Sequence, residues 1–202
     1  MGGDALITIG LTGKYCSGKS YIASLFAQRN IAVIDVDQLG HTTLETVKEQ
    51  VVTIFGKQIL SATGAVDRKQ LGAIVFADPA KLAMLESLMH PVMVETCKGL
   101  IEEYKEQGKE AVLINAALLH RMQLDTLCDF ACFVYAPSLI RYLRAVRRDK
   151  ASCRSFRRIA KAQKDISPEC LIGPSAVYIL ENWKGEGYIH RQIDQFCGTM
   201  GI

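Results

Sequence analysis

This sequence of 202 residues lacks the features that mark membrane and exported proteins. Its longest apolar stretch, Ala111–Leu119, is interrupted by Asn115, so nothing approaches the ~20 apolar residues that a membrane-spanning helix needs. The N-terminus carries Asp4 and no basic region, which argues against a signal peptide. Its first residues resemble a myristoylation site but place Leu6 where serine or threonine is required. We therefore expect a cytoplasmic protein with no membrane partner.

Metal-binding and disulfide patterns are also missing. The sequence has no C-x-x-C pair, its cysteine count is odd, and the four histidines offer no zinc spacing near any cysteine. We expect reduced, structural thiols in a reducing compartment. The seven cysteines are Cys16, Cys97, Cys128, Cys132, Cys153, Cys170 and Cys197.

The net charge of +3 is unevenly distributed. Residues 141–164 hold ten basic residues and one acidic residue, a net charge of +9, which leaves about −6 for the rest of the chain. Such a segment favours a polyanionic partner, although a merely solvated basic helix face is the alternative. Only Tyr142 and Phe156 interleave the cations, and this scarcity of aromatics argues against single-stranded nucleic acid as the partner.

Apolar runs alternate with helical patterns along the chain. The runs are apolar throughout, as is typical of parallel strands covered on both faces, and they predict five strands. These runs are Leu6–Leu11, Ile31–Val36, Ala111–Ile114, Phe130–Tyr135 and Val177–Leu180. Helical spacing is found in Gly18–Arg29, Lys69–Phe76, Lys81–Glu106, Ser138–Arg148, Arg154–Lys164 and Ile189–Phe196. The sequence therefore predicts an α/β protein with a five-stranded parallel sheet.

One domain is expected, with two insertions. The interval between the second and third strands is too long for one crossover helix, so residues 38–109 are predicted to form a helical subdomain, in which Pro79 and Pro91 mark helix starts or turns. Residues 149–175 form a second, basic insertion, which we call the lid. The core then comprises residues 1–37, 110–148 and 176–202.

One glycine-rich segment predicts phosphate binding. Residues 13–20 match G-x-x-x-x-G-K-[ST] in full, directly after a strand pattern and at the start of a helical one. Backbone N–H groups of such a loop, together with the helix N-terminus, bind phosphate oxygens. Lys19 is expected to reach the β- and γ-phosphates, and Ser20 to ligate Mg²⁺. The predicted ATP-binding residues here are Gly13, Lys14, Cys16, Ser17, Gly18, Lys19, Ser20 and Tyr21.

Two carboxylates follow the second predicted strand, where ligands of open α/β sheets bind. Side chains alternate between the faces of a strand, and Asp35 and Asp37, two residues apart, are expected to share one face. Asp37 is the expected general base for a hydroxyl that attacks the γ-phosphate. Alternatively, both residues cap the following helix or hold metal-bound water. Residues 37–40 also spell the D-x-x-G of GTPases, but the chain has no N-K-x-D motif to read guanine.

Arginines share one face of the helix predicted at Ser138–Arg148. Arg141, Arg144 and Arg148 are three and four residues apart, and Leu139, Ile140, Leu143 and Val146 supply the apolar side. Guanidinium groups beside a phosphate loop stabilise the charge on a transferred phosphoryl group and suit a lid that excludes water. We therefore expect Arg144 and Arg148 to contact ATP.

The predicted insertion carries a more specific pattern. In order it contains Phe55-Gly56, Gly64-Ala65-Val66-Asp67-Arg68, Leu71, Val75-Phe76, Asp78, Leu85-Glu86 and His90-Pro91. With the phosphate loop, the Ile34–Asp37 motif, Gln163 and the last strand ending at Asn182, this set resembles the dephospho-coenzyme A kinase family over nearly all of the chain.

This resemblance implies transfer of the ATP γ-phosphate to the ribose 3′-hydroxyl of dephospho-coenzyme A, the last step of coenzyme A synthesis. Asp37 matches the catalytic aspartate and Arg148 the arginine at the phosphates, with Lys19 assisting. The insertion would receive the acceptor through Arg68 and His90, with Asp37 and Leu118 contributing from the core. Alternatively, His90 makes a helix-start contact and Arg68 pairs with its neighbour Asp67.

The sequence departs from that family at two places. The family's Pro-Leu-Leu-x-Glu run reads Ala-Leu-Leu-His-Arg at residues 117–121, and Asn115 stands where an acid is more usual. In the phosphate loop, Lys14 replaces a glycine, and Tyr15 and Cys16 replace small residues. Two alternatives therefore stay open: a kinase of this architecture for another small acceptor, and a non-catalytic nucleotide sensor or RNA-binding protein. The oligomeric state is not predicted.

Overall fold

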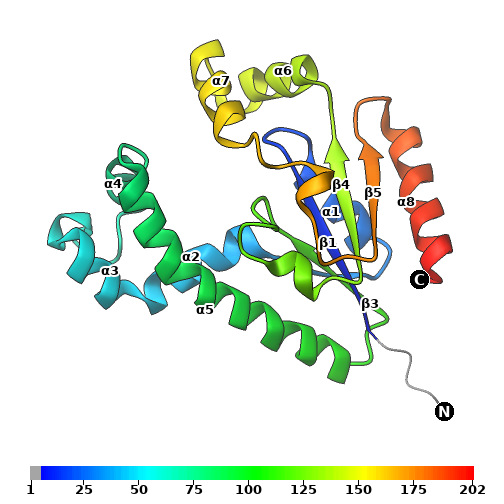
Figure 1. Cartoon of the computed structure of the whole chain (residues 1–202), viewed down its shortest axis with the longest axis horizontal. Helices are drawn as coiled ribbons and strands as arrows, with labels where there is room; N and C mark the ends of the chain where they lie inside the picture. The colour runs from blue at the N-terminus through cyan, green and yellow to red at the C-terminus, as the bar shows by residue number, and fades with distance from the viewer. Residues whose placement is uncertain (1–5) are drawn as a thin grey trace. The chain divides into compact units, whose positions relative to one another are not determined.

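The sheet of this protein has five parallel strands in the order β2-β3-β1-β4-β5 (Figure 1). The computed structural model describes residues 6–202, so the expectations concerning Asp4 and the myristoylation-like start lie outside the described residues. The strands are β1 (Ile7–Gly13), β2 (Ala32–Asp35), β3 (Ala111–Asn115), β4 (Phe130–Tyr135) and β5 (Ala176–Glu181). The five predicted strands are therefore confirmed, with small shifts at their ends.

Helices follow or separate these strands. They are α1 (Lys19–Ala27), α2 (Val36–Thr46), α3 (Lys48–Phe55), α4 (Arg68–Val75), α5 (Pro79–Glu106), α6 (Ser138–Asp149), α7 (Cys153–Ala162) and α8 (Glu186–Met200), with short 3₁₀ turns η1 (Lys57–Ile59), η2 (Leu124–Leu127) and η3 (Pro168–Cys170). Among residues 6–202, no helix is both long and apolar enough to cross a membrane.

The chain divides into two compact units, and each is described by itself. The first contains the sheet and comprises the residues up to Asp35 together with Lys98–Ile202; the second is Val36–Cys97. The boundaries differ from the expected insertion of residues 38–109, because the last part of α5 belongs to the unit that contains the sheet. One covalent connection between the units is the Asp35–Val36 bond, where a strand passes into a helix without a loop.

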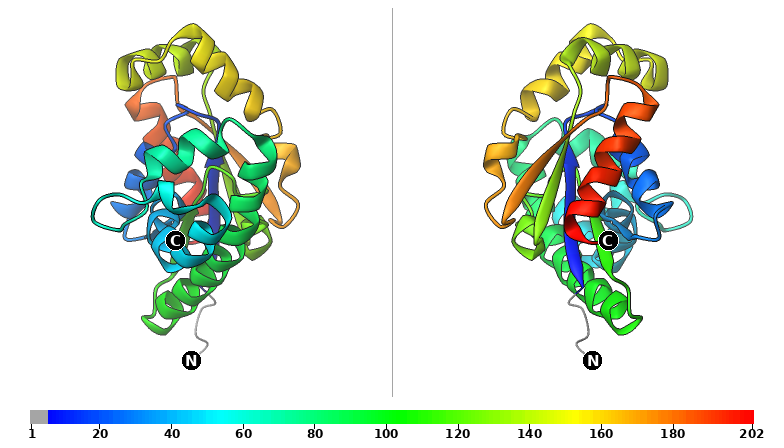
Figure 2. Two further views of the ribbon diagram at one scale, coloured as in Figure 1. Left: turned by 90° about the vertical axis from the view of Figure 1, so that its left-hand side faces the viewer. Right: turned by 90° about the vertical axis from the view of Figure 1, so that its right-hand side faces the viewer.

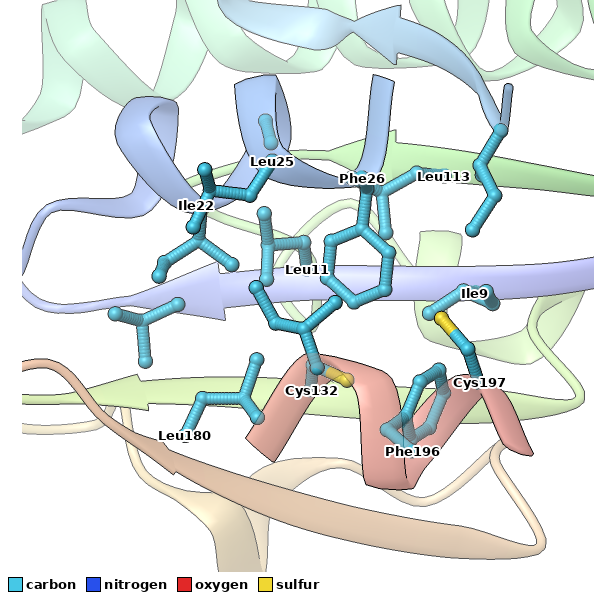
Figure 3. Close-up of a cluster of buried hydrophobic side chains, with 14 of the residues drawn as sticks. Ile9, Leu11, Ile22, Leu25, Phe26, Leu113, Cys132, Leu180, Phe196 and Cys197 are labelled. Carbon is cyan, nitrogen blue, oxygen red and sulfur yellow. The ribbon is translucent and has the colours of Figure 1, made fainter. Parts of the chain in front are cut away.

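The core of the first unit lies between the sheet and the helices α1 and α8 (Figure 3). Leu11 on β1 and Ile22 and Phe26 on α1 are completely buried, and Phe26 meets Phe196 of α8 edge to face at 5.9 Å between ring centroids. Figure 2 shows α8 running lengthwise along this face of the sheet. This packing fixes β1 and the start of α1, and with them the two ends of the phosphate loop.

The second unit is helical and has its own small core, which includes Val51, Phe55 and Leu71. Asp67 caps α4, because its carboxylate accepts hydrogen bonds from the backbone N–H groups of Lys69 and Gln70. α5 starts at Pro79, as predicted, but runs on through Pro91, where a helix start or turn was expected. A proline there removes one hydrogen bond of the helix, and apolar side chains on both sides of it still pack on this core.

The outer strand β5 is capped at its carboxyl end by a side chain of α8. The Gln192 amide accepts a hydrogen bond from the backbone N–H of Glu181 at 3.0 Å and donates one to its carbonyl at 3.3 Å. It thus occupies the two backbone groups that a neighbouring strand would use.

Candidate active site

The phosphate loop connects the end of β1 at Gly13 to the start of α1 at Lys19. Gly18 has a φ of 97°, and a Cβ atom there would lie 2.1 Å from Nδ2 of Asn182, so both the backbone conformation and the close approach require glycine. Cys16 also adopts a left-handed conformation, with a φ of 60°, although it is not a glycine. Residues that follow β4 and β5 surround this loop.

Arginines of α6 hold the carbonyl groups on the outside of the loop. Arg144 Nη1 donates to the Ser17 carbonyl at 2.9 Å, and Arg141 Nη1 donates to the Tyr15 carbonyl at 3.4 Å. Asn182 Nδ2 donates to the same Ser17 oxygen at 2.8 Å, while Arg144 Nη2 reaches the Asn182 carbonyl at 2.7 Å. Because a carbonyl and the next N–H point in opposite directions, these bonds turn the N–H groups of Cys16 and Gly18 away from α6.

The orientation of α6 is the reverse of the usual amphipathic arrangement. Of the predicted arginine face, Arg141 and Arg144 are directed inward and Arg141 is only 8% exposed, whereas Arg148 near the end of the helix is exposed. The predicted apolar face is directed to solvent, with Leu139 66% and Leu143 55% exposed. The reason is local: the loop directs carbonyl oxygens toward the helix, and the guanidinium groups of Arg141 and Arg144 donate to them.

The Ser17 hydroxyl is buried and has no hydrogen-bond partner among the described residues. The residue is 1% exposed, and Oγ has no hydrogen-bond partner within residues 6–202. A buried hydroxyl without a partner is costly, so this atom fits a loop that completes its hydrogen bonds with a phosphate oxygen.

Lys19 is held by the carboxyl end of β3. Its ammonium group donates to Oδ1 of Asn115 at 2.7 Å, and Nδ2 of Asn115 donates to Oδ2 of Asp35 at 3.3 Å. The strand register explains this, because Asn115 is paired with Leu11 on β1 and with Asp35 on β2. Sequence reasoning noticed Asn115 only as a departure from the family and did not predict that it positions Lys19.

Asp37 lies on a helix. β2 ends at Asp35 and α2 begins at Val36, which places Asp37 exposed in the first turn of α2. The expectation that Asp35 and Asp37 share one face of a strand is therefore wrong, because the strand does not continue. The expectation that Asp37 acts as the base stays a prediction.

The first turn of α1 carries the two remaining candidates of the loop. Ser20 is exposed, and its hydroxyl is a hard oxygen ligand of the kind that Mg²⁺ prefers. The Tyr21 hydroxyl donates to Glu186 on α8 at 3.2 Å, so its hydrogen is already used in a bond to α8. Ser20 thus fits a metal that accompanies the nucleotide, and an ATP contact of Tyr21 stays a prediction.

A cluster around Tyr15 joins the loop to α6 and α7. Arg148 Nε and Nη2 both donate to Asp149 at 2.8 Å, and the Tyr15 hydroxyl donates to the same carboxylate. These bonds, that from Arg148 first, lower the pKa of Asp149 to about 2. Burial, followed by the bond to Asp149, raises the pKa of Tyr15 to about 12. The cluster therefore keeps one protonation state across the physiological range.

The segment after β3 in which the sequence departs from the family's pattern, residues 117–121, is bonded to the lid. Arg121 donates from Nε and Nη2 to the Asp165 carboxylate at 2.6 Å, and His120 Nε2 lies 2.8 Å from Asp165 Oδ2. The bond from Arg121 is the main cause of a lowered pKa of Asp165. These three residues connect the part of the lid that follows α7 to the loop that follows β3. Sequence reasoning recorded the changed residues but did not predict their partner.

A pocket of about 390 Å³ lies between the end of β4, the start of α6 and η3. Lys14 and Arg141 line it, together with Ser138 and Glu169. The predicted ATP-binding residue Lys14 therefore adds positive charge beside the phosphate loop.

The outward side of α6, α7 and the residues after α7 is strongly cationic. Seven side chains there are exposed, and none makes a hydrogen bond or ion pair within residues 6–202. They are Arg147, Lys150, Arg154, Arg157, Arg158, Lys161 and Lys164.

The predicted acceptor residues fall in both units. Arg68 is exposed at the start of α4; no ion pair with Asp67 occurs in the described part of the chain, and Asp67 instead caps that helix. His90 is half-buried inside α5, and Leu118 is half-buried after β3. Their contacts with an acceptor stay predictions.

Comparison with known proteins points to one family. A family model described as dephospho-CoA kinase matches residues 7–183. A dephospho-CoA kinase of Borreliella burgdorferi is 32% identical over 197 residues, which cover 96% of this chain and 94% of that protein. The crystal structure of TT1252 from Thermus thermophilus matches with a TM-score of 0.79 and 26% identity over 96% of this chain and 97% of that one. A dephospho-CoA kinase from Campylobacter jejuni shares the fold, with a TM-score of 0.64 and 21% identity, over 96% of both chains.

Proposed function

This chain belongs to the dephospho-CoA kinase family, and from that premise we propose how its residues transfer the γ-phosphate of ATP to the 3′-hydroxyl of dephospho-coenzyme A. The protein is a P-loop kinase that phosphorylates an alcohol group. The observation that carries the proposal is the phosphate loop itself, whose carbonyls are held from outside by Arg141, Arg144 and Asn182.

In this mechanism the loop binds the triphosphate through backbone N–H groups and the Ser17 hydroxyl. Lys19, held by Asn115, neutralises charge on the β- and γ-phosphates. Arg148 stabilises the charge that spreads over the oxygens of the transferred group. Mg²⁺, which the Ser20 hydroxyl would ligate, neutralises part of the triphosphate charge when it is bound with the nucleotide.

Asp37 is the general base of the proposed reaction. It accepts the proton of the ribose 3′-hydroxyl while that oxygen forms a bond to the γ-phosphorus and the bond from phosphorus to the β,γ-bridging oxygen breaks, releasing ADP. Arg68 and His90 are proposed to bind the acceptor in the second unit, and Leu118 to contact it from the first. The residues that line the phosphate loop, Gly13 to Tyr21, are proposed to contact ATP.

A coupled assay of ADP release with Mg-ATP, with and without dephospho-coenzyme A, tests this function. Wild type should release ADP only when the acceptor is present, and Asp37→Asn should lose turnover by 10²-fold or more while still binding Mg-ATP. The matched control is Asp194→Asn, because Asp194 is 61% exposed, lies on α8 and pairs with Arg29 beyond the end of α1. ADP release that ignores the acceptor would contradict the substrate assignment, and full activity of Asp37→Asn would contradict the assigned base.

The alternatives raised by the sequence are not favoured by the family match. A non-catalytic sensor has no need of a base, whereas the family is one of kinases. The unpaired cations of α7 keep one test worthwhile: binding to generic RNA with a steep salt dependence would support a nucleic-acid function.

A further inference from the structure

Tyr15 connects the phosphate loop to α6 and α7 through its backbone and its side chain. Its N–H donates to Oε1 of Gln163 at 2.7 Å, and its carbonyl accepts from Arg141. Its hydroxyl donates to Asp149, and its ring packs 6.2 Å from that of Phe156. A loop residue whose N–H is already bonded does not offer that N–H to a phosphate, so Tyr15 serves another purpose than binding the nucleotide directly.

Arg148 is restrained by the same residue. Its guanidinium carbon lies 5.6 Å from the centroid of the Tyr15 ring, and two of its nitrogens donate to Asp149, which also accepts from the Tyr15 hydroxyl. The Arg148 side chain is 65% exposed and would otherwise sample many rotamers. The bonds to Asp149 use Nε and Nη2, so Nη1 lies outside this bidentate pair and can contact an anion at the loop.

We propose that Tyr15 is a positioning residue for phosphoryl transfer, which with Asp149 holds the Arg148 guanidinium beside the phosphate loop before ATP binds. The proposal rests on the proposed function, in which Arg148 stabilises the transferred group. A guanidinium that is already oriented loses less conformational freedom when it contacts the phosphate. Ordering one long side chain costs enough to change a rate by about 2- to 10-fold, and this sets the expected size of the effect.

Electrostatics supports an arrangement that does not change with pH. The hydrogen bond to Asp149 is the main cause of a raised pKa of Arg148, so the guanidinium stays charged. The phenol stays protonated and Asp149 stays ionised between about pH 4 and pH 10, because the pKa of Tyr15 is about 12 and that of Asp149 about 2. Removal of Tyr15 should therefore lower kcat by a constant factor between pH 6 and 9, without adding a new ionisation to the profile.

A double-mutant cycle on kcat tests the proposal. Tyr15→Leu should lower kcat about 2- to 10-fold, whereas in the Arg148→Gln background the same change should alter kcat by less than about 2-fold, because there is no guanidinium left to position. Tyr15→Phe keeps the ring under Arg148 and should retain most of kcat. The proposal is overturned if Tyr15→Leu has no effect, or if it has the same effect in both backgrounds.

The control is Tyr142→Leu, which removes a tyrosine from the same hydrophobic cluster. The Tyr142 ring packs against Phe156 at 5.4 Å, whereas the ring beside the Arg148 guanidinium is that of Tyr15. Its effect on kcat should be the same in both Arg148 backgrounds, and thermal unfolding of each variant shows which proteins are folded. If Tyr15→Leu does not fold, the cycle is run with Asp149→Asn, which keeps the packing of Tyr15 and changes the carboxylate that accepts from both Arg148 and the Tyr15 hydroxyl. It should lower kcat in the wild-type background and not in the Arg148→Gln background, and equal effects in both would overturn the proposal.

A separate outcome identifies failure of the underlying function. If wild type shows no ADP release that depends on dephospho-coenzyme A, the proposed reaction fails, and the cycle is then read on the Kd for the ATP analogue AMP-PNP by calorimetry. Coupling between Tyr15 and Arg148 in that affinity supports the positioning role without the acceptor. Additive effects on the Kd overturn it.

Discussion

Replacement of Asn115 by leucine would test how strongly the end of β3 positions the phosphate-loop lysine. Asn115 is 1% exposed and makes hydrogen bonds of 2.7 Å to Lys19 and 3.3 Å to Asp35. Hydrogen bonds to charged groups contribute about 1.5–3 kcal/mol each, and the longer one counts for less, so we expect a loss of about 2–3 kcal/mol. For a protein of this size that corresponds to a fall in Tm of about 4–12 °C.

Asn115→Asp keeps the shape and changes the charge. At an effective dielectric constant of about 20, attraction to Lys19 at 2.7 Å is worth about 6 kcal/mol and repulsion from Asp35 at 3.3 Å about 5 kcal/mol. The two nearly cancel, so Tm should change little. The repulsion from Asp35 is the same wherever Lys19 lies, whereas attraction to residue 115 must be given up when the ammonium moves to a phosphate. Giving up about 1 kcal/mol or more of that attraction weakens ATP binding by about 5-fold or more.

The assays are thermal unfolding and titration of Mg-ATP, followed through the single tryptophan, Trp183, one residue after the loop contact Asn182. Gln192→Leu is the control, because Gln192 also makes two hydrogen bonds from one amide but lies on α8; it should lower Tm and leave ATP binding unchanged. The reasoning is refuted if Asn115→Leu has the Tm and ATP affinity of wild type, or if Asn115→Asp binds ATP more tightly than wild type.

Three further predictions use other parts of the structure. Arg121 lowers the pKa of Asp165, so the stability that this carboxylate contributes is present above about pH 4 and is lost as the pH falls. The free energies of urea unfolding of wild type and Asp165→Asn should therefore converge below about pH 4. A constant difference between them down to about pH 2 would contradict this. Leu143→Glu should leave Tm within about 2 °C, since Leu143 is 55% exposed, whereas Arg144→Met should lower Tm and weaken ATP binding; the opposite order would contradict the orientation of α6. Neutralising the four cations of α7 should lower kcat/KM for ATP several-fold and make it less dependent on salt, with kcat unchanged, because these cations attract the triphosphate before it binds. Equal salt dependence of kcat/KM in the variant and wild type would contradict this electrostatic steering. The four residues are Arg154, Arg157, Arg158 and Lys161.

The sheet could be predicted because its signals are local. Each strand is a continuous apolar run, and a run such as Ala111–Ile114 is typical of a strand that helices cover on both faces of a parallel sheet. The phosphate loop was equally accessible, since its spacing and its position between a strand and a helix are both present in the sequence. The end of β2 was not, because nothing in Asp35-Val36-Asp37 indicates that the helix starts at Val36.

The site depends on contacts between residues far apart in the sequence, and those could not be predicted. Periodicity gave the two faces of α6, but not that the arginine face is directed inward, because this depends on carbonyls of a loop more than 120 residues away. Tyr15 was noted only as unusual, since its partners Asp149 and Gln163 are not adjacent to it in the sequence. Asn115 likewise gained a role only when the strand register placed it beside Asp35.

The capping of β5 by Gln192 has a consequence for how copies of this chain behave at high concentration. An outer strand presents unpaired backbone groups, and these can template pairing with a second molecule and so begin aggregation. At Glu181 both backbone groups are already occupied by the Gln192 amide. A side chain from α8 thus leaves no free backbone group at Glu181 with which a strand of a second molecule could pair.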